Sequence, residues 1–384
     1  MADSVASEQA SSRRVIPLRR KLVFALVIWV FVLGVPELML RLLWHPAPRT
    51  PAVGTRQFVN WLSRLSEDER DPQPLYRTDS RLLWRLEPGV QIASFNHHFA
   101  PNGETQPIQI SINEEGYRGS KVSQAKKSSV SRILCLGDSN FFGYPLDDAD
   151  TFPSVLEKTL RARAPERKWE VTNGGVPGYT VVQGWRWYQE AFQDHHFDFL
   201  LLSFLNNDAW RQPGQDLDLL SQKASPLQPL GDFARQSRLV SWVEACIRPA
   251  IPKDRYVPRV SKDDFISHYR LLIDAARKAG TRVVILDYRA YAQYEPYSQA
   301  LRVLAADTGV EYLLVGERIA GAMSDAKIIS RYPLQADRIQ RRWGTELLSQ
   351  RPYLWYFAEY HPEHLNELGV AWLTDQLKEI FVPE

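Results

Sequence analysis

The alternation of short apolar runs with helically spaced segments from residue 132 onward restricts the fold most strongly. Strands are predicted at 133–136, 169–172, 197–204, 282–286 and 311–315. Helices are predicted at 151–164, 181–192, 263–279, 298–307 and 366–380. The strands are almost continuously apolar, which is typical of burial on both faces. Repeated strand–helix units therefore predict an α/β fold, a parallel sheet with helices on both faces.

An apolar run ahead of this domain predicts a membrane helix over residues 22–44. Its 23 residues, at about 1.5 Å each, would cross a hydrocarbon core of about 30 Å with some tilt. The uninterrupted part, 22–35, is shorter, so a cleaved signal peptide is the alternative. No A-x-A-like cleavage site follows, and Glu37 and Arg41, which interrupt the run, could pair on a helix. An uncleaved signal anchor is therefore favoured.

Charge around this helix predicts its orientation. Five basic residues precede it: Arg13, Arg14, Arg19, Arg20 and Lys21. By the positive-inside rule, residues 1–21 form a cytoplasmic tail and the chain after residue 45 is exported. A bacterial chain of this kind would sit in the inner membrane and face the periplasm.

The remaining sequence divides into a strand-rich segment with a linker, 45–127, and a main domain, 128–384, which carries an insertion near 211–260. Within the first segment, Ile108, Ile110 and Ile112 alternate with other residues and predict a strand with these side chains on one face. Residues 113–116 then predict a turn.

Composition and motifs exclude several classes of protein. Lys+Arg 47 against Asp+Glu 45 leaves a formal charge of +2, so a nucleic-acid partner is not expected. Two cysteines, Cys135 and Cys246, are too few for a disulfide framework or a cysteine-built metal site, although one bridge between them stays open. The chain has no phosphate-binding loop, dinucleotide fingerprint or G-x-S-x-G elbow, and we predict neither a cofactor nor a metal.

Candidate catalytic residues follow successive predicted strands. Ser139, in Gly137-Asp138-Ser139, would lie at the carboxyl end of the first strand, where open α/β sheets bind ligands. A nucleophilic serine needs a base and oxyanion donors. Gly178 follows the next strand and could donate its N–H to an oxyanion. Asn206 and Asn207 follow the strand after that, and their side-chain amides could supply another donor, while His364 precedes the last helix. The alternatives are ordinary structural roles: a helix cap, a tight turn, a loop residue and a surface histidine.

In this order, the four blocks Gly137-Asp138-Ser139, Gly178, Asn207-Asp208 and His364 resemble the SGNH (GDSL-like) hydrolase family. The resemblance covers about residues 130–384, and the chain is similar also to membrane-anchored members with a strand-rich segment before the catalytic unit. It implies a flavodoxin-like three-layer sandwich and ester or acyl chemistry. It also implies Ser139 as nucleophile, His364 as base, and an oxyanion hole of Ser139 N–H, Gly178 N–H and the Asn207 side chain.

The chain departs from the family pattern at two positions. Leu205 stands where the asparagine block usually opens with glycine, and His361 stands where an aspartate usually precedes the catalytic histidine by three residues. Glu359 and Glu363 are the nearest carboxylates that could orient His364 instead. Otherwise the site would work as a Ser–His dyad.

Two functions remain as hypotheses. The first is a serine esterase or O-acyltransferase that acts on acyl, in particular acetyl, esters of envelope or extracellular glycans, with lipid esters as the next substrate class. The second is a non-catalytic anchored binding or assembly protein that retains the fold. The helically spaced aromatic residues 185–192 predict core packing, with a carbohydrate-stacking platform as the alternative.

Overall fold

The computed structural model describes residues 17–43, 75–92, 108–122, 129–221, 237–247, 252–289, 291–323, 326–358 and 363–382. The chain divides into two compact units. The small unit comprises residues 1–49 and 224–250, and the main unit comprises 50–223 and 251–384.

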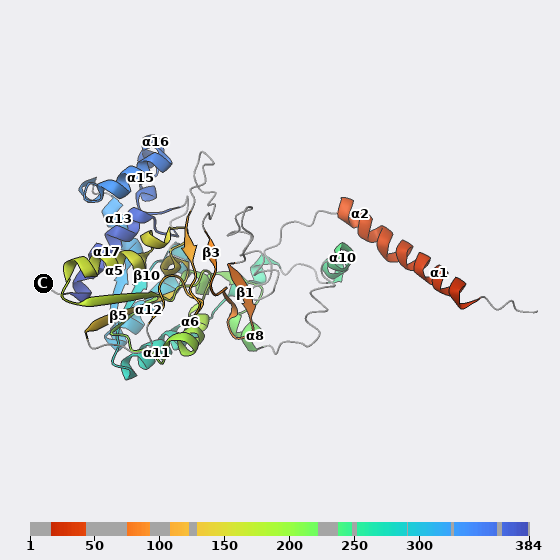
Figure 1. Cartoon of the computed structure of the whole chain (residues 1–384), viewed down its shortest axis with the longest axis horizontal. Coiled ribbons are helices and arrows are strands. Elements are labelled where there is room, and N and C mark those ends of the chain that lie inside the picture. Colours follow the sequence, from red (N-terminus) through yellow and green to blue (C-terminus); the bar gives the residue numbers. More distant parts are fainter. Residues whose placement is uncertain are drawn as a thin grey trace, which may run out of the picture. The chain divides into compact units, whose positions relative to one another are not determined.

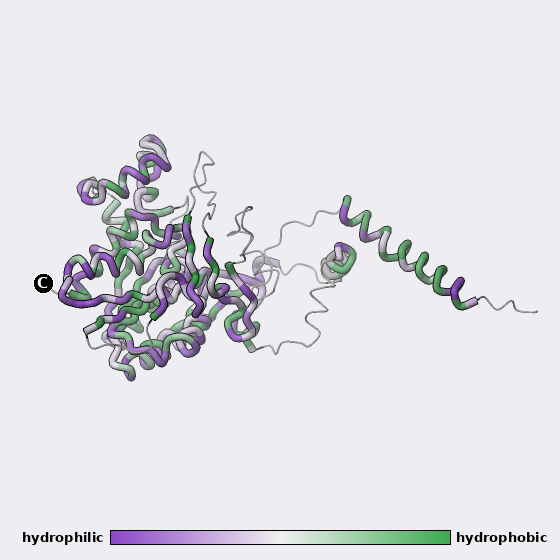
Figure 2. The backbone as a smooth tube through the Cα atoms, viewed as in Figure 1, coloured by the Kyte–Doolittle hydropathy of each residue, from purple (hydrophilic) through white to green (hydrophobic). Residues whose placement is uncertain are grey.

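The small unit contains one long apolar helix. It is built from α1 (Leu18–Trp29), the π-helical turn η1 (Val30–Gly34) and α2 (Val35–Leu43). These 26 residues are long and apolar enough to cross a membrane, and Figure 2 shows them hydrophobic along most of their length. The turn η1 ends two residues before Pro36, which has no N–H for the regular helical pattern. Trp44, the last residue of the predicted span, lies outside the described residues.

The main unit is organised by a five-stranded sheet of β5 (Val130–Gly137), β6 (Lys168–Asn173), β7 (Phe199–Ser203), β10 (Arg282–Asp287) and β11 (Glu311–Leu314). All its pairings are parallel, and the spatial order is β11-β10-β7-β5-β6. Counted along the chain this order is 2-1-3-4-5, the flavodoxin-like arrangement. The predicted α/β class is therefore confirmed, and all five predicted strands are present.

Helices cover both faces of the sheet and complete three layers (Figure 1). One face carries α5 (Phe152–Arg163), α13 (Val315–Met323) and α17 (Glu367–Phe381), and the other carries α6 (Val181–Trp187), α11 (Lys262–Lys278) and α12 (Glu295–Thr308). Alternate residues of β5 belong to the two hydrophobic cores. Ile133 and Cys135 lie in the core with α5, α13 and α17, whereas Leu134 and Leu136 lie in the core with α6, α11 and α12. Burial on both faces explains why the strands read as continuous apolar runs.

Two predictions about individual side chains are settled here. The predicted helix over 181–192 consists of α6, which ends at Trp187, and the π-helical turn η3 (Tyr188–Phe192) that directly follows it. Trp187, Tyr188 and Phe192 are buried, so the aromatic cluster is core rather than a binding platform. Both cysteines are free, Cys135 buried and Cys246 exposed, so the open question of a bridge is answered in the negative.

The strand-rich segment packs into the main unit. It forms two small antiparallel pairs, β1 (Tyr76–Asp79) with β2 (Leu83–Leu86), and β3 (Gln91–Ile92) with β4 (Ile110–Ser111). The three predicted isoleucines are buried, but only two residues pair, so the strand is shorter than predicted. Arg118 from this segment is fully buried and donates to Asp148 and to the carbonyls of Phe142 and Gly143. Its other acceptors are the carbonyls of Gln109 and Leu146.

Short elements that the sequence patterns did not indicate fill the connections. The helices are α4 (Ser139–Phe142), α7 (Asn206–Ala209), α8 (Asp216–Ser221), α10 (Arg238–Ile247), α14 (Ala326–Ile329), α15 (Pro333–Trp343) and α16 (Thr345–Gln350). The remaining pieces are β8 (Arg211–Gln212), β9 (Val257–Pro258) and the 3-10 turns η2 (Asp148–Asp150), η4 (Lys253–Arg255), η5 (Ala292–Tyr294) and η6 (Pro352–Trp355). Most are too short for a hydrophobic period to be recognised.

Close backbone contact between the loops after β5 and β6 gives a test of the fold. A Cβ on Gly175 would lie 2.2 Å from the Phe142 nitrogen and 2.9 Å from the Asp138 carbonyl oxygen. We expect Gly175→Ala to lower the free energy of unfolding by about 1–3 kcal/mol, measured by urea denaturation. Gly321→Ala in α13 is the control, because its Cβ meets nothing within 4 Å. An equal loss in the control would contradict this contact.

Candidate active site

Ser139 and His364 are in direct contact. The Ser139 Oγ lies 2.8 Å from the His364 Nε2. Ser139 opens the short helix α4 directly after β5, and Asp138 caps this helix by accepting from the Asn140 N–H at 3.0 Å. The capping role weighed as an alternative therefore exists, but Asp138 performs it. The serine hydroxyl is paired with an imidazole at the carboxyl end of a central strand.

The start of α17 holds the His364 loop in place. The Ala358 N–H donates to the His364 carbonyl at 2.9 Å, and the Asn366 N–H donates to the Tyr356 carbonyl at 2.9 Å. The buried Asn366 side chain accepts from the first N–H groups of α17 and donates to the carbonyls of Leu354 and Phe357. Asn366 was not among the predicted site residues, although asparagine before an amphipathic run is a common capping signal.

Asn207 lies beside the nucleophile turn. Its Nδ2 donates to the Asp138 Oδ2 at 3.1 Å. Burial raises the pKa of the Asp138 carboxyl. Leu205, which replaces the usual glycine of this block, has a φ of 178°, an extended conformation open to any residue. The departure at Leu205 therefore does not disturb the position of Asn207.

Gly178 is fixed through the two peptide groups that flank it. It has a φ of +79°, which favours glycine, and an added Cβ would lie 3.1 Å from the Trp84 ring. The Trp84 Nε1 donates to the Pro177 carbonyl at 3.2 Å, and Arg259 donates to the Gly178 carbonyl at 2.7 Å. Because N–H and C=O point in opposite directions across a trans peptide, the first bond sets the direction of the Gly178 N–H.

Arg259 belongs to a buried polar network. It pairs with Asp216 through two hydrogen bonds, of 2.7 and 3.1 Å, and both side chains are almost fully buried. A third bond, of 3.1 Å, reaches Gln183 in α6. Trp84 and Arg259 were not among the predicted site residues, because nothing in their local sequence pattern marks a contact with a loop 81 to 93 residues away.

Asp208 connects the asparagine block to α6. Its Oδ1 accepts from the Val181 N–H at 2.8 Å, while its Oδ2 is buried and has no hydrogen-bond partner among the described residues. Burial raises the pKa of this carboxyl well above its ordinary value.

The residues expected to orient His364 are only partly described. His361 and Glu359 lie outside the described residues. The Glu363 carboxylate accepts a hydrogen bond from the Tyr291 hydroxyl. The roles of these three residues stay predictions.

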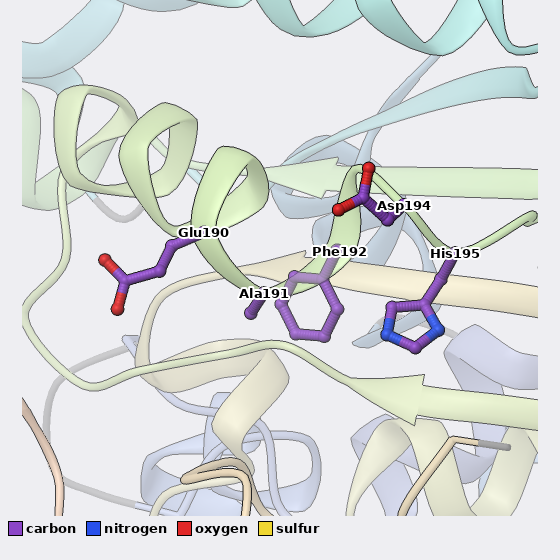
Figure 3. Close-up of a pocket in the computed structure, with 5 residues that line it drawn as sticks. All are labelled: Glu190, Ala191, Phe192, Asp194 and His195. Atoms are coloured by element: carbon purple, nitrogen blue, oxygen red, sulfur yellow. The ribbon is translucent and has the colours of Figure 1, made fainter. Parts of the chain in front are cut away.

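A separate cavity lies at the opposite edge of the sheet. Glu190, Ala191, Phe192, Asp194 and His195 line it, and they precede the amino end of β7 (Figure 3). Glu190 is already paired with Arg85. The cavity contains none of the four predicted catalytic blocks. Within the described ranges, no group of three or more potential metal ligands is present.

No family model matches the chain, and no curated protein matches it. Similar solved structures include an acetyl xylan esterase (13% identity, TM-score 0.38), which covers 65% of this chain and 100% of its own. A lipolytic protein of the G-D-S-L family from Desulfitobacterium hafniense has 13% identity and a TM-score of 0.38, and the match covers 65% of this chain and 99% of that protein. A lipase/acylhydrolase from Enterococcus faecalis has 12% identity and a TM-score of 0.37, and the match covers 65% of this chain and 96% of that protein.

Likeness at this level carries no argument about activity. The class of the protein follows from its own strand order and site: a three-layer α/β protein of the flavodoxin-like type, with a serine–histidine pair at the carboxyl edge of the sheet. A further similar solved structure is described as a GDSL-like lipase from Parabacteroides merdae; it has 11% identity and a TM-score of 0.39, and the match covers 65% of this chain and 94% of that protein.

Trp84 provides a test of how the glycine loop is held. Trp84→Phe keeps an aromatic ring at this position but removes the indole N–H that binds Pro177, and the control below loses the same ring volume. A hydrogen bond contributes about 1 kcal/mol, so we expect kcat for a small ester to fall about fivefold with KM little changed. Trp187→Phe is the matched control, because its buried N–H has no partner among the described residues. Equal losses in both variants would contradict a specific role for Trp84.

Asp208 predicts a pH dependence of stability. The folded protein retains a proton on Asp208 at pH values where the unfolded chain has lost it, so stability falls as pH rises above the ordinary pKa of 3.8. Asp208→Asn should remove this contribution, and its urea midpoint relative to the parent should rise with pH. Asp218→Asn, at an exposed position of α8, controls for loss of charge. A difference that is constant with pH would contradict the prediction.

Proposed function

We propose that this protein is a serine hydrolase of ester bonds. The observation that supports this best is the 2.8 Å contact between the Ser139 Oγ and the His364 Nε2. In the first step, the Ser139 Oγ attacks the ester carbonyl and His364 accepts the hydroxyl proton. The leaving alcohol then takes that proton from His364. Water, activated by the same imidazole, hydrolyses the acyl-enzyme and restores the serine.

The oxyanion donors in this proposal are the N–H groups of Ser139 and Gly178 and the side chain of Asn207. An amide nitrogen carries two hydrogens, and Asp138 accepts only one from Asn207. The second hydrogen is then available to a developing oxyanion, and the bond to Asp138 fixes the amide plane. Trp84 and Arg259 act as positioning residues, because they hold the peptide groups on either side of Gly178.

Orientation of His364 is assigned to a residue of its own loop. Glu359 or Glu363 would supply the negative charge that His361 cannot, and without either the pair works as a dyad. The competing proposal is a non-catalytic anchored binding or assembly protein that retains this fold. The observation that favours it is His361, which stands in place of the usual aspartate.

The proposed location follows from the helix Leu18–Leu43. It would act as a single-pass anchor that leaves the main unit outside the cytoplasm, facing the periplasm in a bacterium. An exported, anchored enzyme would meet acyl esters of envelope or extracellular glycans, acetyl esters in particular, with lipid esters as the next class. Transfer to a sugar hydroxyl differs from hydrolysis only in the acceptor of the acyl group.

Activity toward a small ester tests the proposal directly. We expect the full-length chain to hydrolyse p-nitrophenyl acetate and Ser139→Ala to reduce the rate to the uncatalysed background. Thermal stability should change little, because the partly exposed hydroxyl contributes little packing. Ser349→Ala, at an exposed position of α16, should retain full activity. Equal rates in parent and Ser139→Ala would favour the non-catalytic alternative.

Adjacent asparagines offer a matched pair for the oxyanion assignment. Asn207→Ala should lower kcat by about 10² to 10³ with a smaller effect on KM, since an oxyanion donor acts mainly in the transition state. Asn206→Ala removes an amide that donates instead to the Tyr288 carbonyl, and kcat should stay within a few-fold of the parent. A change confined to KM in Asn207→Ala would count against its assignment.

A further inference from the structure

Glu37, one of the charged residues that interrupt the apolar helix, binds the beginning of α10. Its carboxylate accepts from the Ser237 hydroxyl at 2.7 Å and from the N–H groups of Arg238 and Leu239 at 3.0 and 2.8 Å. Arg41 donates to the same carboxylate at 2.7 Å. The first N–H groups of a helix lack intrahelical partners and carry partial positive charge, so a carboxylate satisfies them well. A residue 200 positions upstream thus serves as the cap of α10.

One face of α10 carries apolar side chains that are exposed to solvent. Leu239, Trp242, Val243 and Cys246 recur at the spacing of one helical face. Trp242 is 42% and Val243 is 38% exposed, and Cys246 is exposed as well. Its ten residues extend about 15 Å, half of what a membrane crossing requires. Short amphipathic helices with tryptophan on the apolar face are typical of the boundary between headgroups and acyl chains.

The position of Glu37 indicates what covers this face. It lies six residues before the end of α2 at Leu43, about 9 Å along the helix axis. If the helix crosses a bilayer, this depth lies near the boundary of one leaflet. Each hydrogen bond to Glu37 is stronger there than in water. α10 is also in direct contact with α2, whose Leu38, Met39 and Leu42 side chains are exposed.

We propose that α10 is a second membrane contact, an interfacial helix docked on the anchor through Glu37, with Trp242 and Val243 in lipid. The proposal rests on the anchor role of Leu18–Leu43 and is independent of ester chemistry. The chain passes between the two units at residues 49/50, 223/224 and 250/251. The insertion would thus leave the main unit, contact the bilayer and return, giving the enzyme two attachments to the membrane surface.

Cys246 allows a site-specific test in the full-length chain. It is exposed whereas Cys135 is buried, so a thiol-reactive NBD fluorophore labels the apolar face of α10. In lipid nanodiscs with one chain each, we expect blue-shifted emission that is quenched by lipids carrying a doxyl group near the headgroup. Glu37→Leu keeps the anchor apolar but removes the cap. In this variant the emission should move to the wavelength seen in water, and the quenching should be lost.

Two controls make the test decisive. Cys246→Ser should remove the labelling, and Glu166→Leu, which removes an exposed carboxylate from the main unit, should retain parental emission and quenching. Unquenched emission in the parent would overturn the proposal; a blue shift without quenching would mean that protein covers this face. Quenching that persists in Glu37→Leu would overturn docking through Glu37. None of these outcomes depends on catalysis.

Discussion

The pairing of β5 with both β6 and β7 is the constraint on which the rest of the main unit depends. The second strand pairs on one side of the first and the third strand on the other, so the loops that follow all three strands begin side by side at one edge of the sheet. Ser139, Gly178 and Asn207 follow these three strands in turn. A strand order that placed another strand between β5 and either neighbour would move these residues apart.

Polar groups buried around that edge determine its detailed geometry. Arg259 forms an ion pair with Asp216, and this pairing offsets the desolvation free energy of burying both charges. Arg259 also donates to the Gly178 carbonyl, and this bond holds the glycine loop in one conformation. Arg118 similarly binds the carbonyls at the end of α4. The strand-rich segment and part of the insertion are therefore structural components of the site, and we do not expect a core of residues 128–384 alone to position Gly178 correctly.

Sequence patterns could predict what depends on local period or on position after a strand. The five strands, their burial and the residues at their ends were predictable, because a strand buried on both faces requires an apolar run. Contacts between distant segments have no such signature. Trp84 beside Gly178 and Glu37 on α10 join residues whose separation in sequence conceals the contact. Whether His361 or a neighbouring glutamate serves His364 stays a prediction.

Identification of the residue that becomes covalently modified tests the central claim most directly. The purified full-length protein would be treated with a fluorophosphonate, digested, and analysed by mass spectrometry. The account predicts a single adduct on the peptide that contains Ser139, and its loss when His364 is replaced by alanine, because the paired imidazole generates the nucleophile. An adduct on another serine, or equal labelling of Ser139 without His364, would contradict it.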